Sequence, residues 1–346
     1  MCILRINLKE STMLILGIES SCDETGLALY SEGEGLIAHM VNSQVELFTE
    51  YGGVIPEIAA RDHSVKIINI LKTLLKKADK KLNDINLVAY TAGPGLIGSL
   101  MVGETVAKTI SNVLDIELLP INHLEGHILA PGLEDDNLET PYLCLLVSGG
   151  HTQIIECSDY GSYKILGETV DDACGEAFDK VGKLLNLDYP GGPKVSKLAA
   201  GGDPARFNFP RALMKDRNLN FSFSGLKTAV LYALEDLDEK DYPDVAASFQ
   251  EAVVDVLVKK LAYAIEQTGI KKLVCSGGVA ANSLLRERLT DMGKTSELEV
   301  SYPKMEFCTD NAAMIAYAGF IRKKYNLKEY PTKFARPRWP LGELYD

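Results

Sequence analysis

The sequence has no long hydrophobic run. A membrane-spanning helix needs about 18 or more consecutive apolar residues, and Lys108 and the pair at 259–260 interrupt the most apolar stretches. Residues 1–9 contain no apolar core of a signal peptide, and Met13, just before the first apolar strand, is a second candidate start, so the presence of residues 1–12 in the mature protein stays open. We therefore expect a protein that is neither membrane-embedded nor secreted.

Paired cysteines and positive charge are also scarce. The seven cysteines are an odd number and form no Cys-x-x-Cys pair, which indicates reduced thiols in a cytoplasm. The formal net charge of −12 argues against a general nucleic-acid coat, although local basic clusters can still contact phosphates. Such clusters lie within residues 72–81, at 322–324, and at Arg336 with Arg338. For the first cluster, a solvated helix face is the simpler interpretation.

The chain does contain one short pattern of strands and turns that occurs twice. Residues 14–30 have an apolar strand, a turn rich in glycine and hydroxyl residues, and a second apolar strand, and residues 142–157 repeat this order. Such turns offer backbone N–H groups to an anion. A strand, a glycine turn and a helix also occur twice, at 87–105 and 273–289. The sequence therefore predicts an α/β fold with two related lobes around a nucleotide cleft, the duplicated actin-like architecture of the hexokinase and Hsp70 type.

The expected lobes follow from this duplication. We place an N-terminal lobe at residues 13–135 and a C-terminal lobe at 140–315, with an insertion at about 189–223, while residues 316–346 are expected to pack back on the first lobe. Apolar spacing predicts long helices at 64–82 and 245–266. The proline-containing tail from residue 331 is expected to run extended over the surface.

His123 and His127 are the first candidates for chemistry. On a helix, positions i and i+4 share one face, with about 5–6 Å between Cβ atoms, close enough to hold one cation. Only five histidines occur in the chain, and a third lies at His151. A His-Glu-x-x-His peptidase is disfavoured because Leu124 follows the first histidine and the glutamate comes one residue later. The alternative is that one or both are ordinary polar residues at the lobe crossing. In either case we expect the pair to lie on a polar crossing, away from the apolar cores.

A divalent metal needs a third ligand, for which Asp310 is the best candidate. It precedes a helix of small residues at 312–319. Two histidines and one carboxylate leave coordination positions open, which is typical of a catalytic site. The alternative role for Asp310 is that of a helix N-cap.

Glycines supply a candidate nucleotide side. The turn at 148–150 offers close backbone approach, and the small residues after the glycine pair at 277–278 leave room for a purine, with Asn282 available for hydrogen bonding. A carboxylate of the acidic stretch 171–180 would accept hydrogen bonds from a ribose diol. An exposed acidic helix is the alternative for that stretch.

Ten motifs, in order along the chain, resemble one family. They are GIESSCDETG (17–26), GGVIPEIAARDH (52–63), GPGLIGSL (93–100), NHLEGH (122–127), LVSGGHT (146–152), GEAFDK (175–180), PGGP (190–193), NFSFSGLKT (220–228), GGVAAN (277–282) and CTDNA (308–312). Together they resemble the bacterial tRNA N6-adenosine threonylcarbamoyltransferases, the TsaD family, formerly described as O-sialoglycoprotein endopeptidases. The resemblance covers the chain from Met13 to the tail.

The resemblance implies transfer of a threonylcarbamoyl group from threonylcarbamoyl-AMP to the N6 amine of the adenosine beside the anticodon, in tRNAs that read codons beginning with adenine. It implies a metal, iron or zinc, on His123, His127 and Asp310. The implied substrate contacts are Leu146, Val147, Ser148, Gly149, Gly150, Asp179, Gly192 and Asn282. Many members have aspartate where this chain has Ser196, which leaves the ribose to Asp179. The implied partners are tRNA, a smaller actin-like paralogue of the TsaB type and a P-loop ATPase of the TsaE type.

The chemistry explains why an activated donor is needed. The adenine N6 lone pair is delocalised into the ring, so the amine attacks only an activated carbonyl such as that of a carbamoyl–phosphate anhydride. Glycine N–H groups would stabilise the leaving phosphate, and a metal would fix and polarise the carbonyl. For the base, the candidates are Asp23 and Glu24 in the first hairpin, with capping of that turn as the equal alternative.

Three other classes compete with this interpretation. A small-molecule kinase would share the fold but has no use for the histidine pair. A metallopeptidase is disfavoured by the motif order. A non-catalytic scaffold, like the smaller paralogue, is disfavoured because both the metal ligands and the glycine turns are intact.

Overall fold

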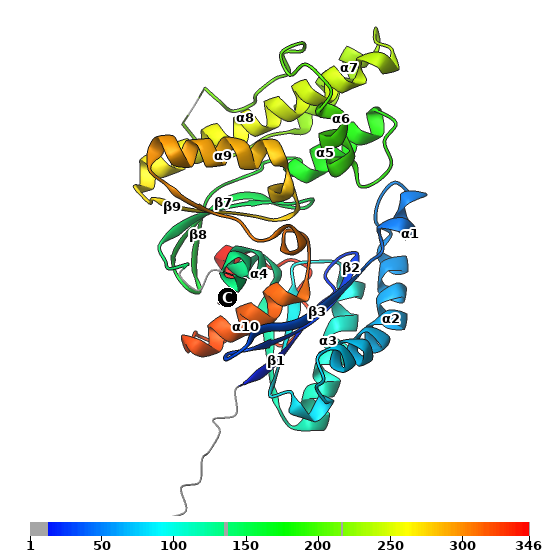
Figure 1. The fold of residues 1–346 in the computed structure, drawn as a ribbon, viewed down its shortest axis with the longest axis vertical. Helices are drawn as coiled ribbons and strands as arrows, with labels where there is room; N and C mark the ends of the chain where they lie inside the picture. Colours follow the sequence, from blue (N-terminus) through cyan, green and yellow to red (C-terminus); the bar gives the residue numbers. More distant parts are fainter. Residues whose placement is uncertain (1–12, 135–137, 216, 346) are drawn as a thin grey trace, which may run out of the picture.

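The computed structural model describes residues 13–134, 138–215 and 217–345, and these contain two five-stranded sheets with the same topology (Figure 1). The first sheet has the strand order β3-β2-β1-β4-β5. Its strands are β1 (Leu14–Glu19), β2 (Glu24–Ser31), β3 (Gly35–Ser43), β4 (Leu87–Gly93) and β5 (Glu117–Asn122). Strands β1, β4 and β5 run parallel, whereas β2 is antiparallel to both of its neighbours.

The second sheet repeats this plan with the order β10-β9-β6-β7-β8. Its strands are β6 (Tyr142–Val147), β7 (Thr152–Asp159), β8 (Ser162–Glu168), β9 (Lys272–Ser276) and β10 (Glu299–Ser301). Again the parallel strands are the first, fourth and fifth along the lobe. The duplicated hairpins and strand–glycine–helix units predicted from the sequence are therefore confirmed.

Helices cover both faces of the first sheet because β1 is apolar on both sides. Leu16 and Ile18 share a core with Ile67 of α2 (Pro56–Lys77) and with residues of α3 (Ile97–Leu114), whereas Ile15 packs with residues of α10 (Ala312–Lys324). Figure 1 shows α10 on one side of this sheet and α2 and α3 on the other. The short helix α1 (Val45–Thr49) precedes α2.

The second sheet has its own helical layer, formed by α5 (Cys174–Leu184), α6 (Gly191–Ala199), α7 (Ser224–Leu234), α8 (Tyr242–Thr268) and α9 (Ser283–Ser296). Val245, Phe249 and Val253 of α8 are buried at helical spacing and join Leu145 of β6 in one core. The predicted helices at 64–82 and 245–266 both exist, but each begins earlier than predicted. In α2 this reflects Pro56, whose fixed φ suits a first helical position.

The crossing between the sheets is apolar, not polar. Helix α4 (His123–Leu129) is buried along its whole length and continues into the 3-10 turn Ala130–Leu133. Leu124 and Ile128 belong to a core that contains Leu16 of the first sheet and Leu146 of the second. The expectation that the histidine pair lies away from the apolar cores is therefore wrong, because α4 passes between the two sheets.

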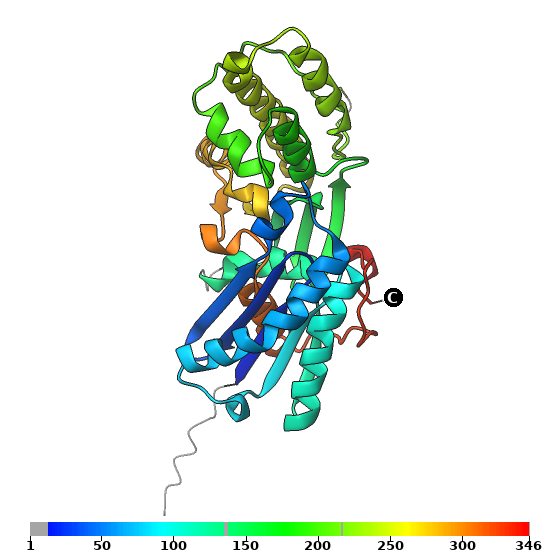
Figure 2. The same cartoon turned by 90° about the vertical axis from the view of Figure 1, so that its right-hand side faces the viewer.

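The C-terminal tail is only partly a surface segment. Trp339 is 1% exposed and its ring centroid lies 4.7 Å from that of the buried Tyr330. The backbone N–H of Arg336 donates to the carbonyl of Ala92 at 2.6 Å. Figure 2 shows the red tail at the side of the molecule, near the level where the lobes meet. The predicted surface course is wrong for Trp339, which packs in the core with Tyr330.

Several expectations remain predictions. The lobe boundaries belong to this group, and residues 1–12, 135 and 346, on which they partly rest, lie outside the described ranges. In the described part of the chain, no helix has both the length and the apolar character of a membrane span. The six cysteines found there are free thiols.

Candidate functional site

The candidate site lies at the carboxyl ends of the parallel strands of the first sheet. Glu19 is the last residue of β1, Thr91 lies near the end of β4, and Asn122 ends β5. The side chain of Asn122 caps α4 by accepting hydrogen bonds from the N–H groups of Leu124 at 2.9 Å and Glu125 at 3.3 Å. This cap fixes the start of α4, and with it the position of His123.

The structure brings together the three residues proposed as metal ligands. Oδ1 of Asp310 lies 3.0 Å from Nε2 of His127 and 3.4 Å from Nε2 of His123. One ligand atom of each residue lies within 4.8 Å of the others. Ligands bound at about 2.1 Å to one ion are at most about 4.2 Å apart, so a small side-chain rotation closes this set around a metal. Two imidazoles and one carboxylate fit a divalent transition metal.

Asp310 reaches the histidines because α10 packs closely against α4. A Cβ atom on Gly126 would lie 3.0 Å from Cδ1 of Ile315 and 3.1 Å from Cγ of Met314, so glycine permits this close approach. Asn311, not Asp310, is the N-cap of α10, and its Oδ1 accepts the N–H of Met314 at 3.0 Å. The alternative role of Asp310 as that cap is therefore wrong, and its carboxylate faces the histidine pair.

A buried carboxylate orients His123 from behind. Oε2 of Glu19 lies 3.1 Å from Nδ1 of His123 and accepts the hydroxyl hydrogen of Thr91 at 2.6 Å. The N–H of Ser21 donates to Oε1 of Glu19 at 2.6 Å, and its Oγ lies 3.2 Å from the same Nδ1. This arrangement directs Nε2 of His123 toward Asp310, as carboxylate–histidine pairs do in metal centres.

The electrostatics of the cluster follow from these contacts. Burial opposes the charged form of His123, but the carboxylates of Asp310 and Glu19 outweigh it and raise the pKa of His123 well above its usual value. Burial would also raise the pKa of Asp310, yet the two histidines hold it well below the usual range. Burial and the charges of His123 and His127 lower the pKa of His151 to about 4. His151 is therefore a neutral imidazole near the site.

The glutamate between the two histidines serves a buried network that reaches both lobes. The guanidinium of Arg322, 3% exposed, donates to both carboxylate oxygens of Glu125 at 3.0 and 3.2 Å. The hydroxyl of Tyr163, on β8 of the second sheet, donates to Glu125 at 3.0 Å, and Tyr330 of the tail also donates to it. Glu125 thus holds α4 to α10, to the tail and to the second sheet.

The glycine turn after β6 forms an open backbone surface. Cβ atoms added to Gly149 or Gly150 would meet nothing within 4 Å, so both face open space. The turn is held from behind, because the N–H of Gly175 donates to the carbonyl of Ser148 at 3.1 Å. Gly277, with φ of +93°, abuts Val147, and only glycine fits there because a Cβ would lie 2.4 Å from the carbonyl oxygen. The turns after β6 and β9 therefore lie side by side.

Two of the expected substrate contacts are already engaged. Nδ2 of Asn282 donates to Oγ of Ser196 and to Oε1 of Gln250, both at 2.8 Å, and its Oδ1 caps α9. The Asn282 side chain is thus hydrogen-bonded within the second lobe, and its contact with substrate stays a prediction. Oδ1 of Asp179 accepts the N–H of Gly191 at 2.7 Å at the start of α6, beside Gly192. Burial raises the pKa of Asp179.

The two candidate bases lie in the β1–β2 hairpin. Burial, together with the neighbouring charges of Asp310 and Asp23, raises the pKa of Glu24 well above its usual value. The described hydrogen bonds of Glu24 include one from Oγ of Ser43 at 3.4 Å. The proximity of Asp310 places Glu24 on the same side of the sheet as the histidine cluster.

The sequence interpretation missed several site residues. Glu19 and Ser21 contact Nδ1 of His123, and Thr91 holds Glu19 in place. The sequence had indicated metal chemistry only at His123, His127 and Asp310. A signal did exist, because Glu19 is a carboxylate at the end of an otherwise apolar strand. Glu125 was used only to exclude a peptidase, and its role depends on Arg322, 197 residues away.

Two lobes of identical strand order, with a candidate metal centre and glycine turns at their strand ends, define an actin-like protein. Solved structures agree on the fold. Full-length HypF matches with a TM-score of 0.60 and 14% identity over 91% of this chain and 47% of that chain. T. kodakarensis HypF matches with a TM-score of 0.64 and 15% identity over 92% of this chain and 48% of that chain. Component A of the Acidaminococcus fermentans (R)-2-hydroxyglutaryl-CoA dehydratase matches with a TM-score of 0.52 and 15% identity over 88% of this chain and 96% of that chain. The chain spans about half the length of the two HypF chains.

A family model described as tRNA N6-adenosine threonylcarbamoyltransferase, TsaD, matches residues 35–317. The chain belongs to this family, and the resemblance inferred from its ten motifs is confirmed.

Proposed function

We propose that the protein transfers a threonylcarbamoyl group from threonylcarbamoyl-AMP to the N6 amine of the adenosine adjacent to the anticodon, in tRNAs that read ANN codons. The observation that carries this proposal is the approach of Oδ1 of Asp310 to Nε2 of both His123 and His127, in a chain of the TsaD family. These three residues would hold a divalent metal, iron or zinc. When bound, the metal supplies Lewis-acid polarisation of the donor carbonyl.

Residues of the chain would bind the donor and direct its reaction. Gly149 and Gly150 face open space, so their backbone would let the phosphate of the adenylate approach closely and would offer it N–H donors. Leu146, Val147 and Ser148 lead into this turn, and Gly192 and Asp179 form a second edge for the ribose. For Asn282 we propose a role in shaping this edge through Ser196, because its amide is already bonded to that hydroxyl.

The reaction forms one bond and breaks one. The N6 nitrogen attacks the carbamoyl carbon, the bond from that carbon to the phosphate oxygen breaks, and AMP leaves. The proton lost from N6 needs an acceptor. A carboxylate with a raised pKa is a stronger base than an ordinary one, so Glu24 is the preferred acceptor.

The direct test is transfer of label from threonine to tRNA. Purified chain, the proposed TsaB-type and TsaE-type partners, the adenylate-forming enzyme, ATP and bicarbonate should yield label in a tRNA that reads ANN codons, and none in a tRNA lacking the target adenosine. A kinase would consume ATP without labelling RNA. Absence of label with an active set of partners would contradict the proposal and favour a scaffold.

We further propose that the smaller paralogue docks on α2 and α3. Exposed apolar residues are Val65 (66%) and Ile68 (44%) on α2, and Ile97 (49%) and Met101 (55%) on α3. Val65→Lys combined with Met101→Lys should abolish co-purification of the paralogue. Val170→Lys, at a site 62% exposed, is the matched control. Unchanged complex formation by the double variant would place the interface elsewhere. Such a complex acting on tRNA is expected in the cytoplasm.

A further inference from the structure

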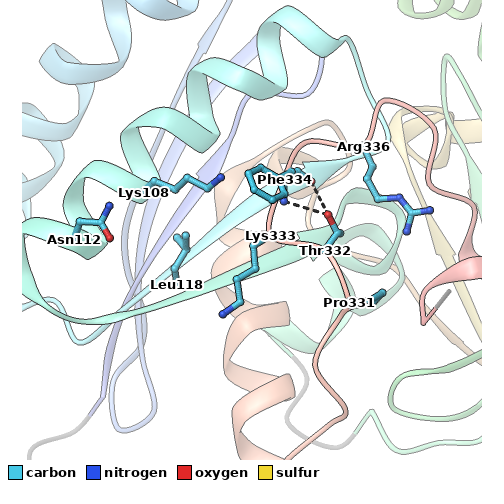
Figure 3. A pocket seen from close by; sticks show the side chains of 8 residues that line it. All are labelled: Lys108, Asn112, Leu118, Pro331, Thr332, Lys333, Phe334 and Arg336. Atoms are coloured by element: carbon cyan, nitrogen blue, oxygen red, sulfur yellow. Dashed lines mark hydrogen bonds between the residues drawn. The ribbon is translucent and has the colours of Figure 1, made fainter.

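A basic pocket opens on the flank of the N-terminal lobe, outside the metal cluster. It has a volume of about 820 Å³ and lies between α3, the start of β5 and the tail (Figure 3). It is lined by Lys108, Asn112, Leu118, Pro331, Thr332, Lys333, Phe334 and Arg336. A smaller cavity of about 340 Å³ shares Asn112, Leu118 and Lys333 with it, so the two adjoin.

The charge of this pocket is opposite to that of the whole chain. Its described lining contains three cationic side chains, Lys108, Lys333 and Arg336, and no acidic one. Glu104 pairs with Lys108 along α3, and Glu117 and Glu329 line the adjoining smaller cavity. In a chain of net charge −12, such a cluster favours contact with an anionic ligand.

An exposed aromatic ring stands among these cations. Phe334 is 68% exposed, and Nζ of Lys108 lies 4.0 Å from its ring centroid. The turn that carries the ring is held by Thr332, whose Oγ1 accepts the N–H of Phe334 at 3.1 Å and donates to its carbonyl at 3.2 Å (Figure 3). Packing against Lys108 accounts for one face of the Phe334 ring, but most of the side chain remains exposed to solvent. A fixed, exposed ring beside cations is typical of a stacking platform for nucleic-acid bases.

The tail connects this pocket to the strand ends that carry the metal cluster. The N–H of Arg336 donates to the carbonyl of Ala92 near the end of β4, and the N–H of Gly95 donates to the carbonyl of Pro337 at 3.2 Å. Three residues beyond Arg336, the carbonyl of Trp339 accepts a hydrogen bond from Nδ2 of Asn122 at 2.9 Å. Asn122 directly precedes His123. The tail therefore runs from the pocket to the strand ends that carry the metal cluster.

We propose that this pocket binds single-stranded RNA next to the target adenosine, with phosphates on Lys108, Lys333 and Arg336 and one base stacked on Phe334. The inference rests on the proposed function, which makes tRNA the substrate. Single-stranded RNA is favoured over an acidic peptide because its bases can stack on the exposed ring while its phosphates meet the cations, whereas carboxylate side chains contact only the cations. It is favoured over duplex RNA because paired bases do not offer their faces.

The test is RNA binding by the purified full chain at low salt. The probes are an RNA hairpin with a single-stranded, adenosine-containing loop and a fully paired RNA of equal length. Lys333→Ala should weaken hairpin binding and lower the slope of log affinity against log salt by about one. Phe334→Ala should weaken hairpin binding by about fivefold or more without changing that slope, and should leave duplex binding unaltered.

Matched controls come from the second lobe. Lys294→Ala removes a lysine that is 71% exposed on α9, and Tyr232→Ala removes an aromatic ring that is 65% exposed on α7. Both should bind the hairpin like the parent chain. The proposal is overturned if the pocket variants bind the hairpin like these controls, or if Phe334→Ala weakens binding of the hairpin and of the duplex equally. It is also overturned if an acidic peptide displaces the hairpin from the parent chain but not from the Phe334→Ala variant, because the ring would then bind the peptide.

Failure of this inference is distinguishable from failure of the proposed function. If label is transferred normally to tRNA and both pocket variants bind the hairpin like the parent, the pocket does not bind RNA but the proposed function stands. If hairpin binding depends on Lys333 and Phe334 but the chain transfers no label, the pocket binds RNA and the proposed function is wrong.

Discussion

The two lobes share one strand order but end their parallel strands in different chemistry. In the first sheet, β1 ends in Glu19 and β5 leads into Asn122 and His123, so side chains fill the space beyond the strands. In the second sheet, the turns after β6 and β9 are built from glycine, and backbone groups fill the equivalent space. One topology therefore places polar side chains at the strand ends of one lobe and glycine backbone at those of the other.

This difference shows what each half can tolerate. The first lobe needs specific side chains held by buried hydrogen bonds, such as that between Glu19 and Thr91 at 2.6 Å. The second needs the absence of side chains, because a Cβ at Gly277 would collide with Val147. A substitution in the first lobe should therefore act through lost ligands or lost partners, and one in the glycine turns through added bulk.

The largest effect should come from the metal cluster. Asp310→Asn keeps the size of the side chain but removes its charge, so most bound metal and at least about 100-fold of the transfer rate should be lost. Metal content measured by elemental analysis, beside transfer of label, checks this. His123→Ala or His127→Ala should lose metal likewise but also lower thermal stability, because both positions are buried. A variant of any of the three that retains stoichiometric metal would show that residue not to be a ligand.

The bridge between the lobes is the next target. Arg322→Ala would leave Glu125 buried without its cationic partner, which should lower the free energy of unfolding by about 3–5 kcal/mol. Lys323→Ala is the control, because its pair with Glu117 is solvent-exposed and should contribute at most about 1 kcal/mol. Urea denaturation of both variants provides the comparison. Equal losses would mean that the Glu125 network does not stabilise the crossing.

The Glu24→Gln variant tests whether Glu24 acts as the base or has only a structural role. A base should give a transfer rate about 100-fold lower, with metal content unchanged. The thermal stability of this variant, in contrast, should be higher than that of the parent at pH above the folded pKa of Glu24. Because the pKa of Glu24 is raised in the fold, the fold favours the protonated carboxyl, and stability falls as pH rises from the unfolded pKa of about 4.3 toward the folded pKa.

The glutamine variant cannot ionise, so it should lack that fall and melt at a higher temperature than the parent at pH above the folded pKa. At pH below about 4 the two proteins should differ little. Thermal melts across this range supply the measurement. A variant with full transfer activity would move the role of base to another residue, with Asp23→Asn as the next variant to assay.

The smallest effect is expected in the glycine turn. Gly150→Ala has room for its methyl group and should leave the melting temperature unchanged, but it should weaken AMP binding about tenfold by obstructing close approach of the phosphate. Gly225→Ala, where an added Cβ also meets nothing within 4 Å, is the control. Calorimetric titration with AMP measures the difference. Identical AMP affinity in both variants would argue against an anion site at this turn.

Local patterns in the sequence predicted the parts of the fold that depend on local order. The hairpin at 14–30 and the helices α2 and α8 follow from apolar periodicity, and the i, i+4 spacing already put His123 and His127 on one face. The surroundings of these elements were predicted poorly. The crossing was expected to be polar, yet α4 is buried, because burial depends on which elements pack around a helix and not on its own seven residues.

The sequence by itself determined which residues could be ligands, which turns had to be glycine, and that the same strand plan occurs twice. Only the tertiary structure decided which of them meet. Glu19 orients His123 from 104 residues away, Trp339 fills the core of the first lobe, and Asn282 bonds to Ser196 and Gln250. Hydrogen bonds act only over about 3 Å, so these contacts depend on how helices and sheets pack, which no local pattern of residues encodes.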